Sequence, residues 1–331
     1  MRDTNLILVE GMPGTGKSTV SQFIDLQLRA QGQASFWCHE ERAGHPVRLF
    51  YASQRHLSWS DYCEEAASLW QNYARQLHAR GQIAVLDASI LQNHLRSMLL
   101  FDSGWSPILD LVRTIENLLV PLRPVWIYLK PNDVERNFRD VVETRGQSLL
   151  DLWIEAQERF PYASRKEAKG FSGFIAFWQE FGELADRVFD DLTIPKLRQV
   201  VTHAASEPHI GGILEFLDVP LSSDRSPLPV LDRFVGEYLP VDDHTARAFT
   251  LQAKGGFLIM CCDRPTMDVR QGPIGCYREI RLISNGQNRF YVAAWPHQIE
   301  FAEDRTGTIV TMRLSTAEEG WSGRNEVYAR R

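Results

Sequence analysis

The sequence lacks several features that would narrow its class at once. Its five cysteines include no CxxC pair; they are Cys38, Cys63, Cys261, Cys262 and Cys276. An odd number of cysteines, in a chain without a cationic, apolar signal segment, favours free thiols in a reducing compartment. We therefore expect a cytoplasmic protein. No apolar run approaches the roughly 20 residues of a membrane span, so the sequence predicts no membrane partner.

The chain also lacks an excess of positive charge. Its 36 Lys and Arg residues stand against 42 Asp and Glu residues, for a net charge of -6. No global basic field would draw it onto nucleic acid, so we expect no nucleic-acid partner. With 331 residues, 44% hydrophobic and 24% charged, it has the composition of a globular protein with room for two domains.

Residues 1–220 alternate short β-rich runs with longer stretches of helical period, which predicts an α/β domain with a five-stranded parallel sheet and helices on both faces. Between the first two strands Val20, Ile24 and Leu28 share a helical stripe, and a second stripe runs from Ser60 to Arg80. The expected strands are 5–10, 34–40, 83–89, 125–130 and 197–203.

The composition changes at residues 221–230, where prolines and serines predict a linker. From 231 to 331, strand-like runs are broken by GG, NG and TG, which indicates a small antiparallel β domain. Two roles remain open for it. Either it is a packing or dimerising module, through which two copies of the chain form a homodimer, or it closes over the acceptor site and narrows the specificity for the acceptor.

The stretch LILVEGMPGTGKSTV carries the strongest motif. Gly11, Gly16, Lys17 and Ser18 fit G-x-x-x-x-G-K-[ST] between an apolar strand and an amphipathic helix. Its backbone N–H groups and the helix N-terminus can converge on phosphates, with Lys17 reaching the β- and γ-phosphates and Ser18 ligating Mg²⁺. The expected phosphate-binding residues are Gly11, Met12, Pro13, Gly14, Thr15, Gly16, Lys17, Ser18 and Thr19.

Acidic residues end two neighbouring strands. Asp87 ends the third strand, and Glu40 and Glu41 follow the second, so all three are expected at the ligand-binding edge of the sheet. Transfer of a phosphoryl group to a hydroxyl needs a carboxylate that accepts the proton. Glu40, Glu41 and Asp87 are the candidate bases, and Asp87 is also a candidate metal ligand.

Basic residues follow the fourth strand and are candidates for covering the γ-phosphoryl group. Arg136 and Arg139 share one helical face, and Arg145 lies about two turns further on. A further run, SRKEAKG, places Arg165, Lys166 and Lys169 in an expected loop.

Together, LILVEGMPGTGKST, the acidic end of strand two, VLDAS, IYLKPNDVERNFRDVVETRG and HIGGILEFLDV resemble the thymidylate kinase and deoxynucleoside kinase group of P-loop kinases over residues 4–220. The resemblance implies MgATP as donor and a mobile arginine-bearing lid. It also implies that Glu40 or Glu41 is the base, that Asp87 is the strand-three acid, and that the lid arginines are Arg136, Arg139 and Arg145. The group follows the strand-three acid with an arginine, whereas here Ala88 follows Asp87.

The leading hypothesis is an ATP-dependent phosphotransferase acting on a hydroxyl of a small molecule, nucleoside-like or an antibiotic. The missing arginine favours an uncharged acceptor. The alternative is a nucleotide-binding switch or ATPase whose β domain docks a protein partner.

Overall fold

The computed structural model describes residues 3–42, 44–49, 58–202, 210–222, 230–241, 248–262, 279–286, 288–316 and 325–331. The chain divides into two compact units, Met1–Val141 with Leu150–Ser222, and Val142–Leu149 with Ser223–Arg331. Each unit is described by itself. Most of the expected linker, residues 223–229, lies outside the described residues.

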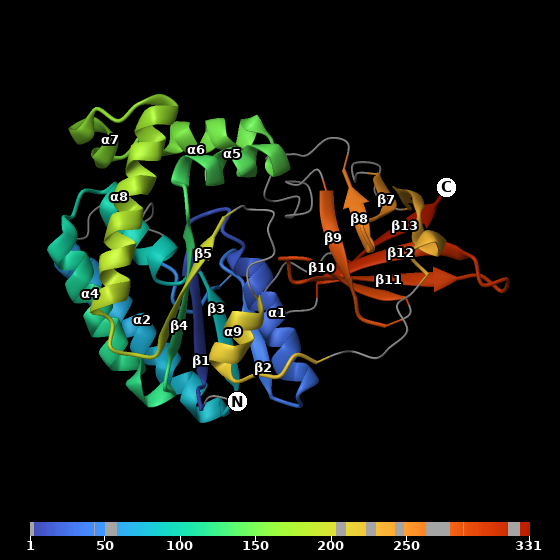
Figure 1. The fold of residues 1–331 in the computed structure, drawn as a ribbon, viewed down its shortest axis with the longest axis horizontal. Coiled ribbons are helices and arrows are strands. Elements are labelled where there is room, and N and C mark those ends of the chain that lie inside the picture. Colours follow the sequence, from blue (N-terminus) through green and yellow to red (C-terminus); the bar gives the residue numbers. More distant parts are fainter. Residues whose placement is uncertain are drawn as a thin grey trace. The chain divides into compact units, whose positions relative to one another are not determined.

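The first unit is built on a five-stranded parallel sheet in the order β2-β3-β1-β4-β5, with β1 at its centre (Figure 1). The α/β fold expected from the sequence is confirmed, and each expected strand is found within a few residues of its position. Val9 pairs with Asp87 and Gly11 pairs with Leu129, so the motif loop leaves the sheet between β3 and β4. The strands are β1 Leu6–Gly11, β2 Ser35–Cys38, β3 Ile83–Asp87, β4 Val125–Pro131 and β5 Lys196–Val201.

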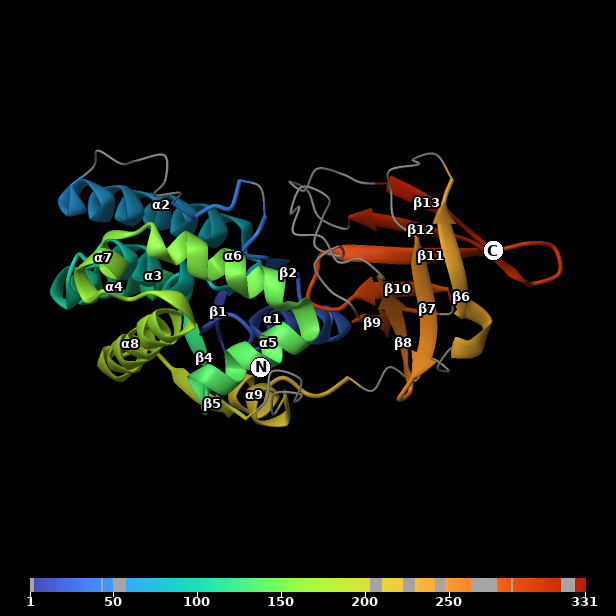
Figure 2. The same ribbon diagram turned by 90° about the horizontal axis from the view of Figure 1, so that it is seen from above.

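Helices cover both faces of this sheet, as Figures 1 and 2 show. On one face α1 (Lys17–Ala30) and α9 (Ile210–Leu217) bury Ile24 and Leu214 against alternate residues of β1, β3 and β4. On the other face lie α2 (Trp59–Arg80), α4 (Trp105–Leu119) and α8 (Gly170–Asp191). There Phe189 of α8 packs on Tyr128 of β4. Shorter elements complete the chain to residue 166: η2 Leu91–Leu95, α3 Arg96–Leu100, η3 Val120–Leu122, α5 Val134–Arg145, α6 Gln147–Glu158 and α7 Pro161–Lys166.

The basic run expected as a loop is partly helical. Pro161 occupies the first turn of α7, where its missing N–H costs nothing, and the helix continues through Lys166. Arg165 forms an ion pair with Asp102, and Lys166 Nζ lies 3.4 Å from Glu180 Oε2. These two cations are therefore held by carboxylates of their own unit.

The second unit contains a closed barrel of eight antiparallel strands. Each strand pairs with its neighbour in sequence, and β13 closes the circle by pairing with β6. Large apolar side chains fill the interior, among them Phe234, Tyr238, Phe290, Phe301 and Tyr328. The expected antiparallel β domain is thus confirmed as a packed barrel. Its elements are η4 Leu231–Phe234, β6 Gly236–Pro240, β7 Phe249–Lys254, β8 Phe257–Cys261, β9 Glu279–Ser284, β10 Arg289–Val292, β11 His297–Glu303, β12 Ile309–Thr316 and β13 Asn325–Arg330.

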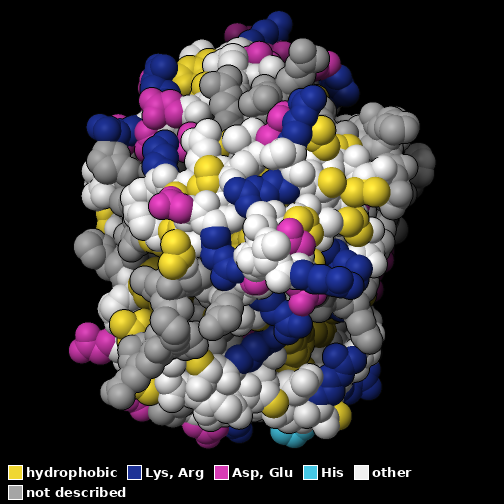
Figure 3. Space-filling view, turned by 90° about the vertical axis from the view of Figure 1, so that its right-hand side faces the viewer, with side chains coloured by type: hydrophobic (Ala, Val, Ile, Leu, Met, Phe, Trp, Pro, Cys, Tyr) yellow, Lys and Arg dark blue, Asp and Glu magenta, His cyan; other side chains and the backbone are white. Residues whose placement is uncertain are grey.

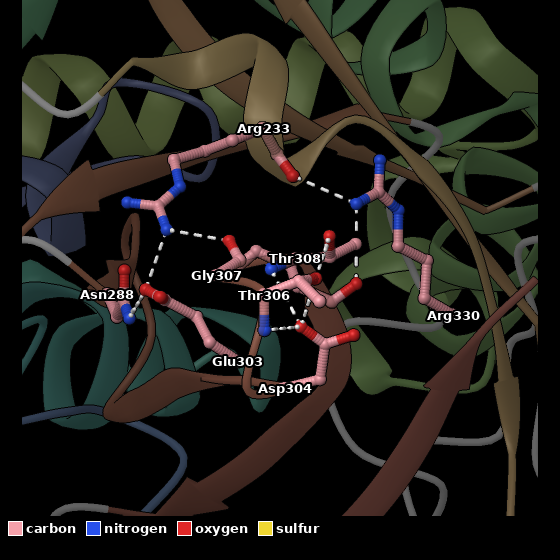
Figure 4. A network of polar contacts seen from close by, with 9 residues as sticks. Arg233, Asn288, Glu303, Asp304, Thr306, Gly307, Thr308 and Arg330 are labelled. Atoms are coloured by element: carbon pink, nitrogen blue, oxygen red, sulfur yellow. Dashed lines mark hydrogen bonds and ion pairs between the residues drawn. The ribbon is translucent and has the colours of Figure 1, made fainter.

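A polar network fixes one end of the barrel (Figure 4). Glu303 accepts hydrogen bonds from Arg233 and Asn288, and Asp304 accepts from Thr306 in the β11–β12 turn. Arg330 donates to the backbone carbonyls of Arg233, Val235 and Ile309. These hydrogen bonds hold the turn and the β6–β13 seam, although the buried Asn288 Oδ1 has no partner among the described residues.

Basic and acidic side chains are interspersed on the face drawn in Figure 3. On the barrel, for example, Lys254 pairs with Glu279 and Arg289 pairs with Glu300. Among the described residues, none of the helices combines the length and the apolarity needed to cross a bilayer.

Candidate active site

The motif loop joins β1 to α1 through left-handed backbone at two glycines. Gly14 has φ +87° and Gly16 has φ +84°, and Gly16 is the residue that caps α1. The loop is also crowded at Gly14, where a Cβ would lie 2.4 Å from Val141 Cγ2. The sequence therefore needs glycine at both positions, and α1 begins with its N-terminal N–H groups and the positive end of its dipole at this loop.

Side chains of the motif loop, of α1 and of α5 stabilise the conformation of the loop through hydrogen bonds to its carbonyl oxygens. Lys17 is buried, and its Nζ donates to the Met12 carbonyl oxygen at 2.9 Å. Thr15 Oγ1 donates to the same oxygen at 2.9 Å. From α5, Asn137 Nδ2 donates to the Pro13 carbonyl oxygen at 2.8 Å. The ammonium group is thus kept on the inner side of the loop, where Gly11 to Gly16 would surround a phosphate.

Asp87 ends β3 as a fully buried carboxylate. Neither oxygen makes a hydrogen bond of good geometry with a described residue, although the Ser18 hydroxyl and the Glu40 amide lie close enough to lower its pKa. Burial raises the pKa of Asp87, the charge of Glu40 raises it further, and Lys17 lowers it. A buried carboxylate without a fixed partner, beside a hydroxyl and an ammonium group, is suited to a cation.

Glu40 and Glu41 follow β2 but have different surroundings. The Glu41 side chain is 50% exposed and lies 3.7 Å from Arg48 Nη1, whereas Glu40 is half-buried. Glu40 influences the pKa of Asp87 and of His39 beside it. His39 is buried and accepts a hydrogen bond from the Glu41 amide at Nδ1, and burial lowers its pKa to about 4. His39 is therefore neutral near pH 7, and Glu40 is the carboxylate that shares Asp87's environment.

Glu10, which sequence reasoning missed, lies directly before Gly11 and is fully buried. Its carboxylate accepts hydrogen bonds from the amides of Ile90 and Leu91 at 2.7 and 3.0 Å, and from Ser89 Oγ at 3.2 Å. Burial raises the pKa of Glu10 to about 7, although these hydrogen bonds and Lys17 lower it. The signal was in the sequence, because LILVEG carries one charged residue in an otherwise apolar strand.

The segment held by Glu10 follows Asp87 immediately. Ala88, at the position where the resembled kinases carry arginine, has φ +53°, in the left-handed region that alanine rarely adopts. The π-helix η2 follows, and its His94 bonds to the Tyr62 hydroxyl and the Trp70 indole of α2, each at 3.0 Å. Glu10 and His94 thus tie η2 to the central strand and to α2.

The predicted arginines lie on α5, but the face of α5 on the loop is formed by Asn137 and Val141. Arg136 is exposed. Arg139 pairs with Glu135 one turn earlier at 2.5 Å, and its guanidinium lies 5.1 Å from the Phe171 ring. Arg145 ends the helix. The structure therefore brings Lys17, Ser18, Asp87 and Glu40 together, and it does not bring Arg136 or Arg139 to them.

The residues at Asp87 fit a magnesium ion. Mg²⁺ prefers oxygen ligands and keeps several waters, so one hydroxyl and one carboxylate suffice on the protein side. Ser18 and Asp87 supply this pair, and Asp87 has two buried oxygens without a well-formed hydrogen bond. Within the described ranges no group of three His, Cys, Asp or Glu side chains could hold a metal, so a closed zinc-type site is not seen there.

No protein-family profile matches the chain. No curated protein matches it either. Among solved structures, it is similar to a thymidylate kinase from Ehrlichia chaffeensis, at 12% identity over 65% of this chain and 97% of that chain, with a TM-score of 0.36. It is also similar to a protein named APE1195, at 11% identity over 66% and 94% of the two chains, with a TM-score of 0.32. Scores this low do not establish a shared function.

Proposed function

We propose that the first unit is an ATP-dependent phosphotransferase that moves the γ-phosphoryl group of MgATP to a hydroxyl of a small molecule. One observation carries the proposal. Lys17, Ser18 and the buried, weakly bonded carboxylate of Asp87 lie together at the N-terminus of α1, with Glu40 beside them. This is the combination of cation, hydroxyl and carboxylates that phosphoryl transfer needs.

The glycine loop and the first turn of α1 bind the donor phosphates through backbone N–H groups. Lys17 turns from the Met12 carbonyl oxygen to the phosphate oxygens and neutralises charge on the transferred group. Ser18 and Asp87 would hold a magnesium ion, which would supply neutralisation of the phosphate charge. Burial of Lys17 and Asp87 excludes water, so their charges act strongly.

Glu40 is the proposed base. The acceptor oxygen attacks the γ-phosphorus, the bond between that phosphorus and the β,γ-bridging oxygen breaks, and the hydroxyl proton passes to the Glu40 carboxylate. Asp87 would serve the cation and Glu41 lies 3.7 Å from Arg48, so Glu40 is the carboxylate best suited to the proton. ADP and the phosphorylated acceptor leave the site.

The test is incubation with MgATP and a panel of nucleosides, nucleoside monophosphates and hydroxylated antibiotics, with mass spectrometry to detect a gain of one phosphoryl group. We expect Lys17→Ala to abolish transfer. Glu40→Gln should lower kcat at least 100-fold and leave ATP affinity within about 3-fold, because general bases contribute 10²–10⁴-fold.

Glu41→Gln is the matched comparison for Glu40→Gln. If Glu41→Gln abolishes turnover and Glu40→Gln does not, the base is Glu41. Full transfer by Lys17→Ala would refute the phosphotransferase. ATP hydrolysis with no labelled compound, together with nucleotide-dependent capture of a protein, would favour the switch.

A further inference from the structure

Glu10 is a buried carboxylate that the proposed reaction does not use, and it lies where the two sides of the proposed magnesium site meet. It directly precedes Gly11, the first glycine of the loop that leads to Ser18. Its neighbour Val9 pairs with Asp87 at the end of β3. One position of β1 therefore lies between the proposed hydroxyl ligand and the proposed carboxylate ligand.

The residues that follow Asp87 are held by β1 at this position. The Ala88 amide donates to the Val9 carbonyl oxygen at 3.0 Å. The Glu10 carboxylate accepts hydrogen bonds from the next three residues, through the Ser89 hydroxyl at 3.2 Å, the Ile90 amide at 2.7 Å and the Leu91 amide at 3.0 Å. Two consecutive residues of β1 thus fix the four residues after Asp87.

This connection needs support from outside itself. Ala88 has φ +53°, a left-handed conformation that is unfavourable for alanine. The Ile90 and Leu91 amides lie at the start of η2, where a helix offers its N–H groups no acceptor of its own. An ionised carboxylate accepts at both oxygens, and Glu10 uses Oε1 for Ser89 and Ile90 and Oε2 for Leu91. A glutamine at position 10 would place an amide donor against one of these groups.

The direction of the Asp87 side chain depends on this connection. Neither Asp87 oxygen makes a well-formed hydrogen bond with a described residue. The carboxylate is therefore directed by the backbone on its two sides. One side is β3, and the other is the left-handed Ala88 that Val9 and Glu10 hold in place.

We propose that Glu10 is a positioning residue of the magnesium site, which keeps the connection after Asp87 in place and so directs the Asp87 carboxylate toward Ser18. This inference rests on the phosphotransferase function proposed above. Glu10 acts through residues 88–91 and not through contact with the ion or the nucleotide. Replacing residues that orient a metal ligand changes metal affinity about 10–100-fold. Loss of the Glu10 carboxylate should therefore weaken the effect of magnesium on nucleotide binding more than nucleotide binding itself.

The first test measures magnesium-dependent binding without turnover. A non-hydrolysable ATP analogue is titrated by calorimetry at about pH 8, above the pKa of about 7 that burial gives Glu10, once with excess Mg²⁺ and once with EDTA. The ratio of the two dissociation constants, here the magnesium ratio, measures what magnesium contributes. We expect Glu10→Gln to lower the magnesium ratio at least about 10-fold and to change the affinity in EDTA less than about 3-fold, because the loop N–H groups remain. Asp87→Asn, which alters the ligand itself, is the reference for full loss.

Glu116→Gln is the matched control, because Glu116 of α4 is a second buried carboxylate with the same kind of partners. It accepts hydrogen bonds from the Thr193 amide and hydroxyl at 2.6 and 3.0 Å and from the Ile194 amide at 3.1 Å. These residues precede β5 of the parallel sheet, so they lie at the edge opposite the ends of β1 and β3. Glu116→Gln should destabilise the fold as Glu10→Gln does and leave the magnesium ratio unchanged. An equal fall of the ratio in Glu116→Gln would overturn the proposal, because the effect would then follow stability alone.

Two further variants test the route through the connection. Glycine adopts left-handed backbone without strain, so Ala88→Gly in the Glu10→Gln background should recover about 3-fold of the magnesium ratio. If Glu10→Gln does not fold, Ser89→Ala replaces it; this change removes one of three hydrogen bonds and should lower the ratio about 3-fold. No recovery by Ala88→Gly, or an unchanged ratio in Ser89→Ala, would overturn the route.

The outcomes separate this inference from the proposed function. A magnesium ratio that falls in Asp87→Asn but not in Glu10→Gln overturns the positioning role and leaves the phosphotransferase standing. A wild type that does not bind the analogue overturns both. A ratio that depends on Glu10, with no labelled compound in the transfer panel, supports the positioning role at a nucleotide site and counts against the phosphotransferase.

Discussion

Replacing Gly14 by alanine should damage the phosphate-binding loop more than the same change at Gly16. Both glycines have φ near +85°, so alanine at either position meets left-handed strain of roughly 1–2 kcal/mol. At Gly16 no atom lies within 4 Å of the new Cβ, so the strain is the whole effect. At Gly14 the Cβ would lie 2.4 Å from Val141 Cγ2.

The Gly14 clash cannot be relieved easily, because valine in a helix has one strongly preferred rotamer. Overpacking of this kind costs about 1–3 kcal/mol. We therefore expect Gly14→Ala to lower the free energy of unfolding by about 2–5 kcal/mol, against about 1–2 kcal/mol for Gly16→Ala. Because Asn137 and Val141 share the contacted face of α5, Gly14→Ala should also weaken the Asn137 hydrogen bond to Pro13.

The assay is urea unfolding followed by circular dichroism at 222 nm, because the described α-helices belong almost entirely to the first unit. Val141→Ala provides a rescue, since it removes Cγ2. In that background the cost of Gly14→Ala should fall by about 1–3 kcal/mol, within the range of contact couplings. Equal losses for Gly14→Ala and Gly16→Ala, or no rescue by Val141→Ala, would refute the reasoning.

Four further predictions concern Glu10, two buried histidines and Arg330. Glu10→Ala leaves two buried amides without an acceptor, so it should lower the free energy of unfolding by about 2–4 kcal/mol, with Glu10→Gln between it and the wild type in urea unfolding. The pKa of Glu10 is about 7 in the native protein against 4.5 for the free group, so the native state binds the extra proton and the contribution of Glu10 to stability falls as pH rises through that range; Glu10→Gln should remove this contribution. His39 and His94 act in the opposite direction, because their native pKa values of about 4 and about 3 mean that they must gain protons on unfolding, so their contribution to stability is lost as pH falls below about 6.5; a midpoint temperature of Glu10→Gln that rises from pH 6 to 4 would contradict this. Arg330→Met leaves the carbonyl oxygens at the β6–β13 seam without their donor and should cost the barrel about 1–3 kcal/mol, seen as faster amide exchange in β6 and β13; unchanged exchange there would contradict it.

The sheet could be predicted from sequence because each strand is a continuous apolar run. LILVEG and IAVLD are buried along their whole length, as parallel strands between two helical layers are. The helical stripe from Ser60 to Arg80 was equally readable, and it is the face of α2 that buries Tyr62, Trp70 and Leu77. These predictions depend on local pattern alone, which is why they were confirmed.

The candidate site was less predictable because it depends on which side chains meet. Helical period indicated α5 but could not show that Asn137, rather than Arg136 or Arg139, faces the loop. The missing arginine after Asp87 suggested a neutral acceptor, which stays a prediction; the structure adds that Ala88 at that position has left-handed backbone. The π-helix η2 that follows has no sequence signal, since the residues at its start donate to the carboxylate of Glu10 from β1.

The barrel's strand order has a consequence for engineering its chain. Every strand pairs with its neighbour in sequence, apart from the closing pair in which Arg330 lies opposite Tyr238. The beginning of β6 and the end of β13 are therefore side by side, and a short peptide could join them. The chain could then be cut at another hairpin, such as the Gly255–Gly256 turn between β7 and β8. The circularly permuted domain would keep all eight strand pairings and would lose only the covalent connection at the cut.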